Sequence, residues 1–446
     1  MADDKLSAGY VETVKDVPRD ETVTALVRTK APEPDREALE QVLSMARAEH
    51  LATRRSDLLR RVTRRYGEGT AFRANLEGAT TEAQARVAEA APNAHHLWLA
   101  NAVAVRGTRQ EIEDLAGHED VISVEPNPEF RVPEILRTPL EDTPNSIDGS
   151  TWGLAKIGTP DVWGGFGRGQ GVLIGHLDTG VDDSHPALAG KVAAFQEFDG
   201  IGNPVVSPTH DSAEHGTHTG GTMVGRTFRG LNIGVAPEAR LASALVLPGG
   251  SGSFAQIIAG MQWAVNQRVH VINMSLGAVG YSTIWNLPVL NATLSGVLVV
   301  ASIGNSGQGT SGGPGNDFLS LGVGATSYTD DAAGFSSGET LVSVPWQIYS
   351  LTYIKPDISA PGVQVVSSIP GNEVAAFNGT SMAAPHVTGS AALLLSTEPA
   401  LQGDPFATRA VLLGTIEDFG EAGRDQRFGF GRVDAHSAAE QTVALQ

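Results

Sequence analysis

The sequence predicts an α/β protein with a doubly wound, mostly parallel sheet that carries helices on both faces, preceded by a small α+β domain. Apolar strand-like runs alternate with helical runs through residues 151–446, as expected for a parallel sheet covered on both faces. Residues 1–135 hold 18 Lys and Arg and 24 Asp and Glu, whereas residues 136–446 hold 13 and 26, so charge density changes between two units. Between them, residues 129–150 are rich in Pro, Asp and Ser and lack periodicity, which is typical of a linker.

The charge-dense front unit contains four expected elements. Leucines between charged positions predict a helix over 34–64. An alternating segment at 95–107 predicts a strand, residues 111–118 a short helix, and residues 121–127 a second strand. This pattern predicts an α+β domain with its own small core.

The charge-poor unit contains the elements of the parallel sheet. Strands are expected at 172–180, 239–247, 270–277 and 296–305, and helices near 254–266 and 287–295. Ligands of such sheets bind outside the carboxyl ends of the strands, so the chemistry-bearing residues are expected there.

Four expected parts follow from these boundaries. They are an N-terminal tail at 1–19, the α+β domain at 20–135, an exposed linker at 136–150 and the parallel-sheet domain at 151–446.

The composition of the chain excludes several functions. Its 446 residues include 31 Lys and Arg against 50 Asp and Glu, a formal net charge of −19, which excludes a general nucleic-acid binder. With no Cys, the chain has no disulfide, thiol nucleophile or thiolate metal site. No run reaches about 18 apolar residues, so we expect no membrane span. The first ten residues lack the pattern of a signal peptide.

Asp178 closes the first expected strand of the sheet, in GHLDTGVDDSHP, and so places a carboxylate at the carboxyl edge. Taken alone, an Asp there is also a common turn or cap residue. Asp-Thr-Gly occurs in aspartic peptidases as well, but these need two carboxylates that share a proton. The chain has no second Asp-(Thr/Ser)-Gly.

His215, in EHGTHTGGT, has the properties of a general base at the start of a helix. His218 follows three residues later, so a zinc pair is an alternative, although the Glu of a His-Glu-x-x-His helix is missing. A buried packing or hydrogen-bonding role is the simpler interpretation of His218. The same interpretation applies to His176, on the strand that ends at Asp178.

Ser381, in FNGTSMAAPHVTG, lies where a turn leads into an apolar helix, so backbone N–H groups and the helix dipole favour a developing anion there. An ordinary N-cap serine is the alternative. The segment is not the Gly-x-Ser-x-Gly turn of α/β-hydrolases, because Ala383 replaces the final Gly. Asn305 places a side-chain amide, or only a turn residue, at the same edge.

Together these segments resemble the subtilisin family of serine peptidases. LDTGVDDSHP, HGTHTGGT and GTSMAAPHVTG match its three motifs in the family's order of Asp, His and Ser. The resemblance covers about residues 150–437 and includes GVAPEARL, VINMSLG, SIGN, KPDISAPGV and FGFGRVDA. It implies a triad of Asp178, His215 and Ser381, an oxyanion-hole amide at Asn305, and substrate-binding residues Ser275, Leu276, Gly277, Ser302 and Gly304.

The implied activity is hydrolysis of polypeptides by a serine endopeptidase through an acyl-enzyme, with broad specificity and an apolar residue before the cut. Residues 20–135 resemble the family's inhibitory propeptide, most clearly at NAVAVRGTRQEIEDLAGHEDVISVEPN. The chain is thus expected to be a self-processing zymogen, with the propeptide as intramolecular inhibitor. We expect the maturation cut between residues 130 and 149, with Phe130, Leu136 and Leu140 as apolar candidates. His95 and His96 of the propeptide are expected to face solvent, the alternative being a pH-sensitive release.

The chain also departs from the family. The resemblance implies no cofactor for catalysis. The family's common calcium site is expected to be absent because Ala187 and about Phe228 replace its Asp and Asn ligands, while structural calcium at sites built from backbone carbonyls stays open. Residues 337–357 form a longer segment than usual, expected to be a surface insertion without an assigned role. The resemblance implies an extracellular location, but the first ten residues show no signal peptide, so the location stays open.

Two other classes of function stay open. One is a binding module that keeps the fold without activity, and the other is an aspartic or zinc-dependent hydrolase. A serine-directed inhibitor and a chelator distinguish these classes.

Overall fold

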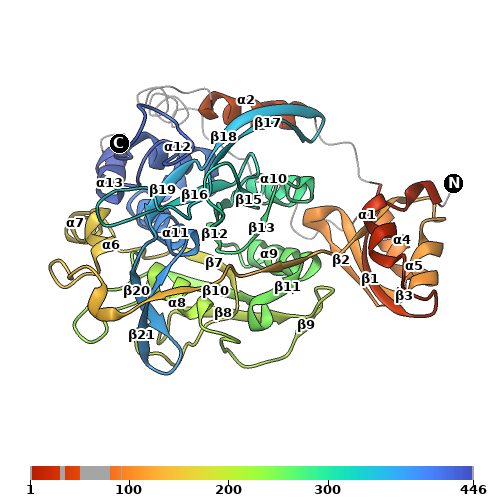
Figure 1. The fold of residues 1–446 in the computed structure, drawn as a ribbon, viewed down its shortest axis with the longest axis horizontal. Helices are drawn as coiled ribbons and strands as arrows, with labels where there is room; N and C mark the ends of the chain where they lie inside the picture. Colours follow the sequence, from red (N-terminus) through yellow and green to blue (C-terminus); the bar gives the residue numbers. More distant parts are fainter. Residues whose placement is uncertain (1–2, 31–35, 51–80, 92, 444–446) are drawn as a thin grey trace.

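The computed structural model describes residues 3–30, 36–50, 81–91 and 93–443, and Figure 1 shows a small N-terminal domain beside a larger α/β domain. The larger domain is built on an eight-stranded sheet with the order β19-β16-β14-β12-β7-β10-β8-β9. The neighbouring strands are parallel except for β8 and β9. The strands are β7 (Leu173–Asp178), β8 (Val192–Phe198), β9 (Pro204–Val205), β10 (Arg240–Leu245), β12 (Val271–Met274), β14 (Leu298–Ser302), β16 (Leu321–Thr326) and β19 (Ile358–Pro361).

Helices cover both faces of this sheet, which confirms the doubly wound α/β prediction. One buried apolar cluster joins the sheet to α9 and α10, and another joins it to α8, α11, α12 and α13. The predicted strands and the helices near 254–266 and 287–295 are all present, with shorter strands than expected. The helices are α6 (Trp152–Lys156), α7 (Thr159–Gly165), α8 (His215–Val224), α9 (Phe254–Asn266), α10 (Asn286–Leu294), α11 (Thr380–Thr397), α12 (Pro405–Gly414) and α13 (Ala435–Val443).

The N-terminal domain is an antiparallel sheet in the order β2-β3-β1-β4 with helices packed on it. The segment 95–107 was predicted as one strand, but it forms two strands joined by a tight turn, in which Asn101 has a φ of 48°. The elements are α1 (Ala8–Val14), β1 (Thr22–Thr29), α4 (Glu82–Ala90), β2 (Ala94–Leu97), β3 (Ala102–Thr108), α5 (Arg109–Leu115) and β4 (Val121–Pro126).

The structure differs from the expected N-terminal tail at 1–19. Helix α1 lies in this segment, and Tyr10 and Val14 are buried in the core of the N-terminal domain. The segment is too short and mixed to show helical periodicity, so only the cover it gives to the sheet reveals its place.

The helix predicted over 34–64 is observed as α2 (Arg36–His50), and residues 51–64 lie outside the described residues. Its apolar face does not join the core of the N-terminal domain. Instead it belongs to a buried cluster that joins the larger domain to one face of the N-terminal sheet, and Figure 1 shows α2 beside β17 and β18.

The segment 337–357, predicted as a surface insertion, is a hairpin of β17 (Glu339–Trp346) and β18 (Tyr349–Lys355). Its outer positions are exposed, as at Val342 and Ile348. Its inner positions, however, are buried in the same cluster as α2.

The segment predicted as an exposed linker is also structured, because it pairs with the larger domain at two places. Strand β5 (Glu129–Arg131) pairs with β11 (Ser251–Ser253), and β6 (Leu136–Thr138) pairs with β21 (Glu373–Asn378). The remaining short strands are β13 (Ala278–Val279), β15 (Gly312–Gly313) and β20 (Val365–Ile369).

Candidate active site

Three adjacent strands end at one edge of the sheet and bring the predicted residues together. Asp178 is the last residue of β7, Ser275 to Gly277 follow β12, and Ser302 ends β14 with Asn305 three residues beyond. This is the carboxyl edge, where parallel sheets bind their ligands.

Asp178 and His215 form a buried pair. His215 is the first residue of α8, and its Nδ1 lies 2.7 Å from Asp178 Oδ1. Both side chains are almost completely inaccessible. Burial by itself would raise the pKa of the Asp178 carboxyl, but His215, aided by His176, holds that pKa well below its usual range. Asp178 is therefore an anion that orients the imidazole.

A chain of hydrogen bonds holds the second oxygen of Asp178. Thr219 Oγ1 lies 3.0 Å from Asp178 Oδ2 and 2.9 Å from His176 Nε2, and His176 Nδ1 lies 3.0 Å from Ser243 Oγ. The prediction that His176 is a buried hydrogen-bonding residue is confirmed. Sequence analysis missed Thr219, because a Thr in a run of small residues gives no signal of its partner.

Ser381 is the second residue of α11 and contacts Ser275, in the segment directly after β12. Its Oγ donates to Ser275 O at 3.3 Å, and Ser275 Oγ donates to Ser381 O at 2.9 Å. His215 Nε2 is buried and has no hydrogen-bond partner among the described residues. The imidazole therefore keeps one nitrogen available for a proton.

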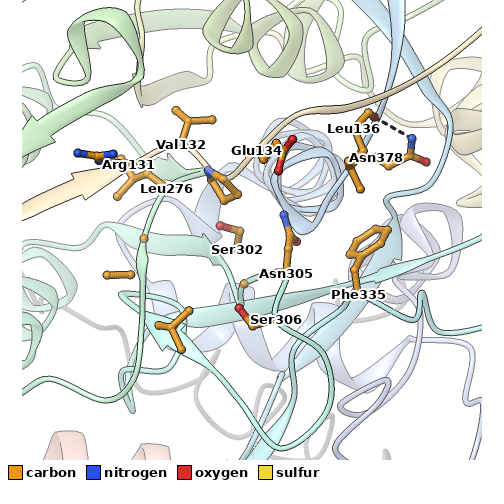
Figure 2. Close-up of a pocket in the computed structure, with 16 residues that line it drawn as sticks. Arg131, Val132, Glu134, Leu136, Leu276, Ser302, Asn305, Ser306, Phe335 and Asn378 are labelled. Carbon is orange, nitrogen blue, oxygen red and sulfur yellow. Dashed lines mark hydrogen bonds between the residues drawn. The ribbon is translucent and has the colours of Figure 1, made fainter.

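The amide of Asn305 is oriented by Thr380. Asn305 Oδ1 accepts hydrogen bonds from Thr380 N at 2.9 Å and from Thr380 Oγ1 at 2.8 Å. This leaves the two Nδ2 protons for another acceptor, and Figure 2 shows Asn305 directed into the pocket.

The pocket beside Ser381 is lined by the predicted residues Leu276, Gly277, Ser302 and Gly304. A Cβ on Gly277 would lie only 2.7 Å from Gly313 O, so glycine is needed there by a close backbone approach. Gly304 has a φ of 111°, which other residues rarely adopt. Sequence analysis did not single out Phe335, which also lines this pocket.

The intact linker lies across this pocket. Arg131 pairs with Gly277 on one side and with Ser251 on the other, and Val132 N donates to Gly250 O at 2.9 Å. In the wall of the pocket, Asn378 Nδ2 donates to Leu136 O at 2.8 Å (Figure 2). Residues 129–131 and 136–138 are therefore held by strand pairing, whereas most of residues 139–149 are exposed, as expected of a linker.

Phe130 anchors the linker upstream of the pocket. Its ring is only 5% exposed and lies 5.1 Å from the ring of Trp285 and 6.3 Å from that of Phe254, measured between centroids. Strand β11, which pairs with Phe130, was also missed by sequence analysis, although its Gly-rich surroundings suggest a close backbone approach.

The other histidines have structural contacts. His218 Nε2 donates to Val365 O and Ala375 O, its ring stacks on Phe377, and burial lowers its pKa to about 3, so the predicted packing role is confirmed. The prediction that His95 and His96 face solvent is wrong, because both are partly buried beside the loop that contains Asp199 and Asn203.

Neither a metal cluster nor a membrane helix is found in the described parts of the chain. No three His, Asp or Glu side chains among the described residues are grouped to hold a metal ion. No described helix has both the length and the apolar character needed to cross a bilayer.

A doubly wound parallel sheet with a buried Asp–His pair and a serine at a helix N-terminus on one edge is typical of a serine peptidase. The profile of the Subtilase family matches residues 169–431. The chain belongs to this family, and it is a subtilisin-like serine endopeptidase.

Curated relatives support this assignment. The chain is 37% identical over 289 residues to the alkaline elastase YaB of Bacillus sp. (strain YaB), which covers 64% of this chain and 69% of that protein. It is 36% identical over 289 residues to subtilisin Savinase of Lederbergia lenta, covering 64% of this chain and 97% of that protein. With subtilisin E of Bacillus subtilis (strain 168) it shares 33% identity over 295 residues, covering 65% and 71%.

Proposed function

We propose that the chain is a self-processing zymogen with a catalytic triad of Asp178, His215 and Ser381. The observation that carries this proposal is the 2.7 Å contact between Asp178 and His215 Nδ1, which leaves the buried Nε2 without a partner. Nε2 takes the proton of Ser381 Oγ as this oxygen attacks the scissile carbonyl, and Asp178 stabilises the imidazolium. The imidazolium then donates its proton to the leaving amine, and water releases the acyl group by the same route.

The negative charge that develops on the carbonyl oxygen is stabilised by hydrogen-bond donors that are already in place. Asn305 Nδ2 is one donor, since Thr380 fixes the other end of its amide. The backbone N–H of Ser381 is the second, at the N-terminal end of the 18-residue helix α11, whose dipole favours an anion.

Substrates bind as extended chains between two short strands, as the linker does. Its pairing with Gly277 and with β11 uses backbone groups only, so it is largely indifferent to sequence. The pocket lined by Leu276, Ser302 and Gly304 accepts the residue before the cut, and its mostly apolar walls favour an apolar side chain. Broad specificity with this one preference follows.

The N-terminal domain acts as the inhibitor of its own enzyme, and maturation occurs within its linker. The strand pairings hold Arg131 and Leu136 on either side of the pocket, so the bond that is cut lies between Val132 and Leu136. This proposed interval lies inside the 130–149 range that the sequence predicts. Of the apolar candidates, Phe130 is disfavoured because its ring is buried upstream of the pocket.

We also propose that calcium is not held at the position that is common in the family. Ala187 offers no side-chain oxygen and is fully buried, and Phe228 packs against His185 with ring centroids 4.7 Å apart. These apolar side chains do not fit an ion that binds only oxygen ligands. The triad chemistry itself needs no cofactor.

The purified wild type and its Ser381→Ala variant test the function when both are followed by intact mass and by hydrolysis of a peptide with a large apolar residue before the cut. Ser390→Ala is the matched control, because it removes the same hydroxyl further along α11. We expect the wild type and the control to split between residues 132 and 136 and then to cleave peptide. Peptide cleavage by Ser381→Ala at the wild-type rate would refute the triad.

A further inference from the structure

Helix α2 is amphipathic, but its apolar face packs outside the N-terminal domain. The segments β1 and α4, which precede and follow it among the described residues, belong to that domain. Leu39, Val42, Leu43 and Ala46 recur at helical spacing and are each at most 4% exposed. Gln41 and Ser44 lie on the exposed side. A surface helix with such a stripe buries it against a partner, and the partner here is not the core of the N-terminal domain.

The core of the N-terminal domain is complete without α2. Its buried residues come from α1, β1, α4, β3, α5 and β4, and none of them comes from α2. That domain has its own contacts with the large domain on α9 and α10. Trp98 N donates to Gln262 Oε1 at 2.8 Å, and Asn291 Nδ2 donates to Leu99 O at 2.9 Å.

Helix α2 packs against α12 and lies beside the β17–β18 hairpin. The apolar face of α2 lies in one buried cluster with Trp346 and Leu351 of the hairpin and Phe406 of α12. Figure 1 shows α2 along the hairpin, on a different side of the large domain from the N-terminal sheet.

The hairpin forms a two-stranded sheet of its own, and its inner face is buried. Leu341, Leu351 and Tyr353 are at most 5% exposed, and Trp346 is fully buried, with its ring centroid 5.6 Å from that of Phe318. By contrast, Val342 and Ile348 are each 67% exposed on the outer side. The inner face is therefore packed on the large domain through Phe318, and the hairpin forms a fixed part of the surface beside α12.

We propose that α12 and the adjoining β17–β18 hairpin form a second docking surface for the N-terminal region, outside the catalytic cleft, and that α2 is the anchor that occupies it. The proposal rests on the inhibitory role proposed above. After the linker is cut, the N-terminal region stays bound through α2 as well as through its sheet domain and its tail in the cleft. Two linked contacts dissociate far more slowly than one, because each holds the other at a high effective concentration.

The first test measures docking without any need for activity. Hydrogen exchange of the hairpin amides, residues 339–355, is followed in the full-length Ser381→Ala protein. The variants added to it are Leu43→Asp, on the buried face of α2, and Ser44→Asp, which brings the same charge to the exposed face. We expect exchange in the hairpin to rise at least tenfold with Leu43→Asp and to stay unchanged with Ser44→Asp. Equal exchange in the two variants would overturn the proposal.

A second variant and a rescue experiment serve as controls for misfolding of the first variant. Val42→Asp changes another buried position of α2 and should reproduce the effect of Leu43→Asp, while exchange in the core of the N-terminal domain stays at the parent level. A synthetic peptide of residues 36–50 added to Leu43→Asp should restore slow exchange in the hairpin. Failure of the wild-type peptide to protect the hairpin at any concentration argues against a docking site.

The second test measures regulation in the active enzyme. With Ser381 present, avidity of about 10² predicts that the N-terminal fragment leaves the catalytic domain about a hundredfold faster in Leu43→Asp than in Ser44→Asp. Size-exclusion chromatography after the cut, and the rise of peptide hydrolysis, measure this release. If no form gains activity even after an added protease cuts the linker, the proposed function fails, whereas the exchange experiment still decides the docking site. Equal release in both variants would refute α2 as an anchor.

Discussion

Phe130 is expected to be the side chain that contributes most to keeping the linker docked in the cleft. Its ring is buried against Trp285 and Phe254, and truncation of a buried Phe to Ala costs about 3–5 kcal/mol. In Phe130→Ala this cost falls on the state in which the linker is docked, while the backbone pairing of β5 with β11 remains. At about 1.4 kcal/mol for each factor of ten, the fraction of molecules with an undocked linker rises about a hundredfold to about three-thousandfold.

Limited proteolysis measures this fraction directly. In a Ser381→Ala background the chain has no proposed nucleophile, so an added trypsin-like protease cuts after Arg131 only when the linker leaves the cleft. The rate of cutting follows the open population as long as the linker opens and closes faster than it is cleaved. The fragment that ends at Arg131 is identified by mass, which separates this cut from cuts elsewhere.

Leu136→Ala is the control, because the Leu136 side chain is 51% exposed and its loss removes little buried surface. We expect it to change the rate of cutting less than threefold. If Phe130→Ala also stays within threefold of its parent, the aromatic pocket does not hold the linker and the reasoning from burial is wrong.

Three further predictions concern the hydrogen-bond chain, the core and the domain contact. Thr219→Val removes the donor to Asp178 Oδ2, and since a hydrogen bond to a charged group contributes about 1.5–3 kcal/mol, kcat for peptide should fall about tenfold with KM unchanged. Thr222→Val, on the same helix, is its control and should stay within twofold. Burial raises the pKa of Asp317 to about 6, so its ionisation costs stability above that pH. Asp317→Asn should therefore raise the calorimetric unfolding temperature at pH 8, and this gain should vanish at pH 4. Burial, with His96 nearby, lowers the pKa of His95, although Asp199 opposes the shift. Docking of the N-terminal domain should therefore be full above pH 6.5 and weaken as the pH falls below it, and chromatography of the His95→Gln variant should show a smaller dependence on pH.

The candidate site was largely predictable because its residues lie where local patterns end. Apolar runs mark β7, β12 and β14, and the polar residues that follow them reach one edge of any parallel sheet. This reasoning could not identify Thr219, because its partners Asp178 and His176 lie on another element. A hydroxyl that bridges two elements has no periodicity and no motif of its own.

The N-terminal region shows the opposite case. Its helix at 36–50 and its strands were visible as periodic segments, although the hairpin at Asn101 was missed because a left-handed turn interrupts a run that alternates throughout. That α2 leaves its own domain, and that the linker lies in the cleft, depends on contacts between segments more than a hundred residues apart.

By itself, the sequence determined the class of fold, the order of the strands and helices along the chain, and the polar residues that meet at one edge of the sheet. The period of hydrophobic residues and the types of side chain are local properties, so each segment of the sequence shows them directly. Only the tertiary structure decided which surface covers α2, where Phe130 is buried and how the linker is held. These outcomes depend on which apolar faces meet, since burial of apolar surface is non-directional and any face of suitable size can serve as the partner.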